Sequence, residues 1–72
     1  MPKSPVLKPR EVIVALERAG FVFERQKGSH RIYIKGRVGV TVPYHNKDLK
    51  RKTLKHIITQ SGLELKQFLD FL

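Results

Sequence analysis

The chain of 72 residues is long enough for one small domain with a thin hydrophobic core. It contains no cysteine, which excludes disulfide scaffolds, thiolate zinc sites and cysteine nucleophiles. Its 15 Lys and Arg residues outnumber its 6 Asp and Glu residues, and the resulting net charge of +9 favours a polyanionic partner such as a nucleic acid.

A highly charged surface with no such partner, as in some heat-stable proteins, is the alternative interpretation of this charge. No apolar stretch approaches the roughly 18 residues that a membrane-spanning helix needs. The N-terminus also lacks the apolar segment of a signal peptide. We therefore expect a cytoplasmic protein that does not contact a membrane.

The N-terminal part of the sequence predicts a flexible arm followed by a helix. Residues 1–7 contain two prolines and no hydrophobic period, so we expect a flexible arm there and a single domain over residues 8–72. Pro9 suits the first turn of a helix, where its missing N–H is not needed. Gly20 is placed to end this helix in the left-handed conformation. Apolar residues recur between them at helical spacing: Val12, Ile13, Leu16 and Ala19.

Between residues 21 and 42 the hydrophobic period changes to two, with glycines at 28 and 36. This pattern predicts three short strands in an antiparallel meander. The alternating apolar residues are Phe21, Phe23, Ile32, Ile34, Val38, Val40 and Val42.

The register of the meander follows if all of these residues lie on one face of the sheet. A two-residue loop at residues 27–28 then pairs Arg25 with His30, and a three-residue loop at residues 35–37, or an equivalent bulge, pairs His30 with Val42. His30 is thus expected at the end of the apolar face. Tyr44 and His45 follow the third strand and should lie at the same edge.

The last third of the chain predicts a second helix and a short helical segment. The helix is expected to open at Thr53, to bury Leu54, Ile57 and Ile58, and to end at Gly62. The apolar residues of the final segment are Leu65, Phe68, Leu69 and Leu72. The predicted fold class is α+β, a single small domain with the element order α-β-β-β-α and a short C-terminal helical segment.

Four short motifs resemble the HicA, or YcfA-like, toxin family in their order and spacing. They are Ala19-Gly20-Phe21, Gly28-Ser29-His30, Val42-Pro43-Tyr44-His45 and Thr53-Leu54-Lys55-His56-Ile57-Ile58. This resemblance implies a double-stranded-RNA-binding-like fold and a bacterial or archaeal toxin that cleaves mRNA without a ribosome. It also implies that the histidine of the Gly-Ser-His motif, here His30, is catalytic, and that a HicB antitoxin covers the active site.

Metal-independent RNA cleavage needs a base for the ribose 2′-hydroxyl proton and an acid for the leaving oxygen, and histidine suits either role. We expect His30 to be the base and His45 to be the acid, with Lys27 and Lys47 as weaker candidates for the acid. Arg25 is expected to stabilise negative charge on the phosphorane.

Phosphate contacts should come from the first turn of the meander and from the basic middle of the chain. Gly28 and Ser29 are expected to hold a phosphate oxygen, because glycine allows the backbone to approach closely. Residues 21–60 hold ten of the basic residues and only two acidic ones. The candidate contacts to single-stranded or structured RNA are Lys27, Arg31, Lys47, Lys50, Arg51, Lys52 and Lys55.

Each candidate also has a purely structural interpretation. His30 can be a core histidine, His45 a turn residue and His56 an ordinary helix residue, while Tyr33 and Tyr44 can either stack on bases or pack against neighbours. The three histidines have no zinc-ligand spacing, so we expect no metal and no cofactor. The alternative functions are a non-catalytic RNA-binding module and an inactive relative that only binds its antitoxin.

Overall fold

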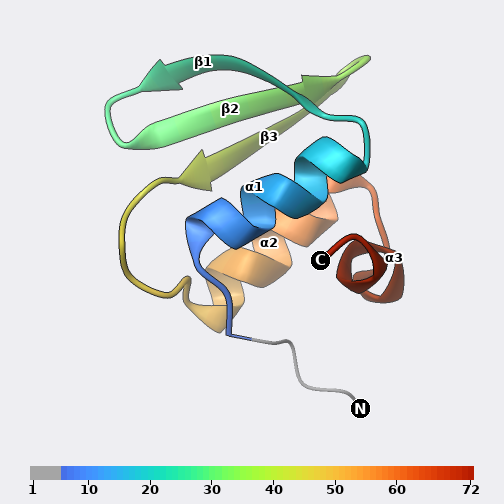
Figure 1. Ribbon diagram of the computed structural model, residues 1–72. Coiled ribbons are helices and arrows are strands. Elements are labelled where there is room, and N and C mark those ends of the chain that lie inside the picture. The colour runs from blue at the N-terminus through green and yellow to red at the C-terminus, as the bar shows by residue number, and fades with distance from the viewer. Residues whose placement is uncertain (1–5) are drawn as a thin grey trace.

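The computed structural model describes residues 6–72 and has the predicted element order, with one three-stranded antiparallel sheet and three helices. The sheet has the strand order β1-β2-β3, and the helices lie on one of its faces (Figure 1). The elements are α1 (Pro9–Arg18), β1 (Val22–Lys27), β2 (His30–Lys35), β3 (Val38–Pro43), α2 (Arg51–Ser61) and α3 (Leu65–Asp70). The α+β class and the short C-terminal helix are confirmed.

Helix α1 begins and ends where local chemistry predicts. Pro9 occupies its first position, and the Glu11 carboxylate accepts a 2.9 Å hydrogen bond from the backbone N–H of Lys8. At the other end Gly20 has φ = 103°, and Phe21 N–H donates to the Leu16 carbonyl at 2.9 Å. This is the Schellman arrangement, which turns the chain sharply from the helix into β1.

Helix α2 begins at Arg51, two residues before the predicted Thr53. Leu49 and Leu54 explain the difference: they occupy the positions before the N-cap and at the fourth helical residue, and both are buried. An apolar pair at these positions fixes the entry of a helix. The predicted end is confirmed, since Gly62 has φ = 76°.

The core lies between the sheet and the helices. The expected core residues of α1 and α2 are buried, and Phe68 brings α3 onto the same core. Leu7 is buried too, and its carbonyl accepts a 2.8 Å bond from Leu49 N–H, so the last residue of the expected arm packs on the domain. Residues 1–5 of that arm lie outside the described residues. The buried apolar residues are Leu7, Val12, Ile13, Ala15, Leu16, Ala19, Phe21, Tyr33, Val40, Val42, Leu49, Leu54, Ile57, Ile58 and Phe68.

The predicted register of both hairpins is wrong. The turns are Gly28-Ser29 and Gly36-Arg37, so Lys27 pairs with His30 and Lys35 pairs with Val38. Both glycines have φ near 60°, at 59° and 60°. A positive φ at the first turn residue belongs to the two-residue turns whose twist matches that of the flanking strands.

The faces of the sheet differ from the prediction for a second reason, a bulge in β1 between Phe23 and Arg25. The extra residue, Glu24, shifts the alternation within the strand. On β2, Tyr33 pairs with the buried Val40, so it faces the helices and is 2% exposed. Ile32 and Ile34, which were expected in the core, are half-buried on the outer face of the sheet.

The left-handed conformation of Gly20 leads to a stability prediction. We expect Gly20→Ala to lower the free energy of unfolding by about 1–3 kcal/mol, because a side chain is strained at this φ. The Cβ would also lie 3.2 Å from Lys35 Cε. The matched control is Gly39→Ala, where an added Cβ meets no atom within 4 Å and φ is not positive. Urea denaturation of both variants is the measurement, and equal midpoints would contradict the assignment of this cap.

Candidate functional site

His30 is the first residue of β2 and stands in the middle of a row across the sheet. It pairs with Lys27 on β1 and with Pro43 on β3. Its side chain is exposed, so His30 is not a core histidine. The carbonyl of the preceding residue, Ser29, accepts a 2.6 Å bond from Tyr44 N–H, and this bond fixes the start of the loop that leaves β3.

The pairing of His30 with Arg25 and Val42 is a prediction that the register contradicts. Lys27 lies directly opposite His30, while Arg25 pairs with Ile32 one step further along the outer face. Arg25 instead forms an exposed ion pair with the neighbouring Glu24. The cation nearest to His30 in the cross-strand register is therefore Lys27, because directly opposed residues are the closest pairs in a sheet.

The Gly28-Ser29 turn is open to solvent next to this row. A Cβ at Gly28 would meet no atom within 4 Å, so the backbone of the turn is accessible. Gln26 holds the turn from the helix-facing side, where its Nε2 donates to the Gly28 carbonyl at 3.0 Å and its Oε1 accepts from Arg31 Nε at 3.1 Å. Gln26 has no signal in the sequence, because its pairing with Arg31 follows from the Gly28-Ser29 turn and not from the expected loop at residues 27–28.

Arg31 follows His30 and lies on the opposite face of the sheet, between two aromatic rings. Its guanidinium carbon is 3.8 Å from the ring centre of Tyr44 and 5.9 Å from that of Phe23. Phe23 was expected in the core, yet it is 51% exposed. Of the two tyrosines considered as stacking candidates, Tyr33 is buried in the core and Tyr44 is exposed.

The other two histidines lie in different surroundings. His45 is exposed two residues after the row of His30, and its Nδ1 accepts a 3.2 Å bond from Lys47 N–H. His56 lies on α2, where its Nε2 is 3.2 Å from Nε2 of Gln60. The Gln60 side chain in turn accepts a 3.3 Å bond from Thr41 N–H on β3. His56 therefore belongs to the contact between α2 and β3.

The basic start of α2 follows the loop from β3. Lys50 is the N-cap of this helix, and the first turn contains no acidic residue. The β1–β2 turn, the end of β3 and the loop that leads to α2 lie along one side of the molecule (Figure 1). A helix N-terminus with basic side chains attracts anions. The exposed basic residues of this segment are Lys47, Lys50, Arg51, Lys52 and Lys55.

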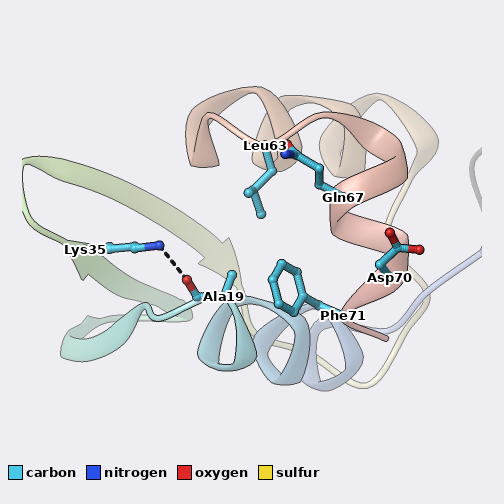
Figure 2. A pocket seen from close by; sticks show the side chains of 6 residues that line it. All are labelled: Ala19, Lys35, Leu63, Gln67, Asp70 and Phe71. Atoms are coloured by element: carbon cyan, nitrogen blue, oxygen red, sulfur yellow. Dashed lines mark hydrogen bonds between the residues drawn. The ribbon is translucent and has the colours of Figure 1, made fainter.

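A shallow pocket of about 240 Å³ lies at the other end of β2 from His30 (Figure 2). There Lys35 Nζ donates a 2.7 Å bond to the Ala19 carbonyl at the end of α1. The pocket is lined by Ala19, Lys35, Leu63, Gln67, Asp70 and Phe71. This contact ties β2 to α1, and the pocket contains none of the predicted site residues.

Residues 6–72 contain no group of three His, Cys, Asp or Glu side chains that could hold a metal ion. No helix in the same part of the chain is long and apolar enough to cross a membrane.

The fold and the site together define a small basic α+β domain with an exposed histidine, a stacked arginine and several lysines along one side. A family model described as HicA toxin of bacterial toxin-antitoxin matches residues 9–63. The match covers well over half of the chain, which therefore belongs to the HicA toxin family. The protein is thus a toxin of a toxin–antitoxin system, with an antitoxin as its partner. A search of curated proteins finds no match.

Proposed function

We propose that this toxin is a metal-independent endoribonuclease that cleaves mRNA in the cytoplasm and that a HicB-like antitoxin blocks it. The observation that carries the proposal is the exposure of His30 at the end of the sheet where the Gly28-Ser29 turn joins β1 to β2 and where β3 ends. We call this the open end of the sheet. A core histidine would instead be buried and hydrogen-bonded. An exposed imidazole next to a lysine and an open glycine turn instead suits proton transfer at a bound phosphodiester.

The reaction needs only the substrate and side chains of this chain. His30 takes the proton of a ribose 2′-hydroxyl, and the 2′-oxygen attacks the adjacent phosphorus. The bond from phosphorus to the 5′-oxygen then breaks, and an acid protonates that oxygen. The products are a 2′,3′-cyclic phosphate and a 5′-hydroxyl. His45 remains our candidate for the acid.

The corrected register changes the residue that we expect to stabilise the phosphorane. Lys27 lies opposite His30, so its ammonium group is better placed than Arg25 for the developing negative charge. The open backbone of Gly28 and Ser29 is suited to a phosphate oxygen. Arg25 is further along the same face and is engaged with Glu24, which favours a role in binding the RNA strand.

We expect His30→Ala to lower the cleavage rate by about 10²–10⁴-fold, since general base catalysis contributes about this much. The assay is incubation of a long single-stranded RNA with each protein in excess EDTA, followed by analysis of the RNA ends. Because His30 is exposed, the melting temperature should stay unchanged. His56→Ala is the matched control and should retain activity.

Three results would contradict this proposal. They are undiminished cleavage by His30→Ala, cleavage products with 5′-phosphate ends, and loss of the activity in EDTA. If neither protein cleaves RNA but both bind it, the protein is an RNA-binding module and not a nuclease.

We expect the removal of basic residues from the start of α2 to make RNA binding less dependent on salt. In a protein that carries His30→Ala, removal of the Arg51 and Lys55 side chains should make the negative slope of log affinity against log salt shallower by about 1.4. Each phosphate contact to a single strand contributes about 0.7 to this slope. The matched control removes Arg37 and Lys66, which are exposed in the β2–β3 turn and on α3, with the same change of net charge. Equal effects of the two double variants would contradict a specific contact at α2, because RNA binding would then depend only on the total charge of the protein.

A further inference from the structure

The stacked side chains of Tyr44, Arg31 and Phe23 form an ordered group on the helix-facing side of the sheet, at the same end as His30. Arg31 is the central member, with its guanidinium carbon 3.8 Å from the Tyr44 ring centre and 5.9 Å from that of Phe23. Such contacts between a cation and an aromatic ring are attractive. We call this group the aromatic stack.

Neighbouring groups hold each member of the aromatic stack in place. Gln26 Oε1 accepts from Arg31 Nε at 3.1 Å and thereby fixes the plane of the guanidinium. Phe23 meets the buried Tyr33 edge to face, with ring centres 5.7 Å apart. The backbone N–H of Tyr44 is bonded to the Ser29 carbonyl at 2.6 Å. The stack is therefore preorganised in the free protein, which lowers the entropy lost on binding.

The aromatic stack is also exposed in spite of this order. Phe23 is 51% exposed and Tyr44 is 39% exposed, although Arg31 already covers part of each ring. Side chains held only for packing would bury these surfaces, since burial of apolar area is favourable. Ordered and exposed aromatic rings next to a guanidinium are the surface on which unpaired nucleobases stack.

We propose that the aromatic stack binds an unpaired nucleobase of the RNA strand whose phosphate lies at His30. His30 and Arg31 are consecutive residues of β2 and face opposite sides of the sheet. A strand that crosses the open end of the sheet at the Gly28-Ser29 turn can therefore place a phosphate on one side and a neighbouring base on the other.

This inference rests on the proposed function in that RNA is the ligand, and it adds that the bound segment is single-stranded. In a duplex the bases are paired and stacked on one another, and their faces are not available to protein rings. We therefore expect the protein to bind a single strand more tightly than a duplex of the same length.

The test uses the full chain with His30→Ala, so that binding is measured without cleavage. The two probes are an eight-nucleotide oligouridine and an abasic strand of the same length with the same ribose-phosphate backbone. We expect Tyr44→Leu to weaken binding of the oligouridine about tenfold, which is typical of the loss of one stacked base. The abasic strand should bind equally to the His30→Ala protein with and without Tyr44→Leu, because it has no base to stack.

Tyr44→Phe is the matched control and should bind both strands as its parent does, because it keeps the ring. Phe23→Leu, on the other side of Arg31, should weaken oligouridine binding severalfold and provides a second test if Tyr44→Leu is unstable. Phe71→Leu removes a ring directly after α3, away from this end of the sheet, and should leave binding unchanged.

Unchanged oligouridine binding in both the Tyr44→Leu and Phe23→Leu variants would overturn the inference. An equal loss on both strands would do so as well, because Tyr44 would then act on the backbone and not on a base. Cleavage by the unmodified protein is a separate readout. If binding depends on Tyr44 and the base but no cleavage occurs, the proposed nuclease activity fails and the stacking site stands.

Discussion

The site depends on one constraint, the register of β2 between its two neighbouring strands. Three features set this register: the two-residue turns Gly28-Ser29 and Gly36-Arg37 and the bulge at Glu24. They turn His30 to the outer face and Arg31 to the helix-facing side, where Arg31 meets Phe23 and Tyr44. Because side chains alternate strictly along a strand, a shift of one residue would exchange these two faces and separate Arg31 from its aromatic partners.

The element order could be predicted because its signals are local. Pro9, Gly20 and Gly62 mark helix ends through their own backbone preferences, and the apolar spacing between them identifies the buried faces. The register could not be predicted in the same way. β2 carries apolar residues on both faces, Tyr33 toward the helices and Ile32 and Ile34 on the outside, so hydrophobic matching did not select one face. The bulge in β1 is a feature of strand pairing, and beyond it Phe23 lies opposite Tyr33 on the helix-facing side.

In the site, too, local sequence signals predict which segments meet, while the strand register decides which residues are neighbours. The predicted candidates do gather along one side of the molecule, because the end of β1, the start of β2 and the end of β3 must meet in an antiparallel meander. Their individual neighbours depend on the register, so Lys27 takes the place opposite His30 that was expected for Arg25. Gln26 and Phe23 had no visible signal, because Gln26 reaches Arg31 through the register of the Gly28-Ser29 turn and Phe23 reaches it through the bulge in β1.

The charge distribution favours the binding of a polyanion on an open surface. Within residues 6–72 the structure has a single ion pair, between Glu24 and Arg25, so most basic side chains keep their charge uncompensated. Uncompensated charge raises the affinity for a polyanion and repels itself in the free protein. A small core that extends from α1 to Phe68 on α3 has to hold these groups together. In the proposed function, the basic side chains supply affinity for any RNA strand, and the open end of the sheet then selects the phosphate to be cleaved. That selection needs a feature that distinguishes one nucleotide position from the next, and on this side of the molecule the aromatic stack is the feature that can read a base and not only a phosphate.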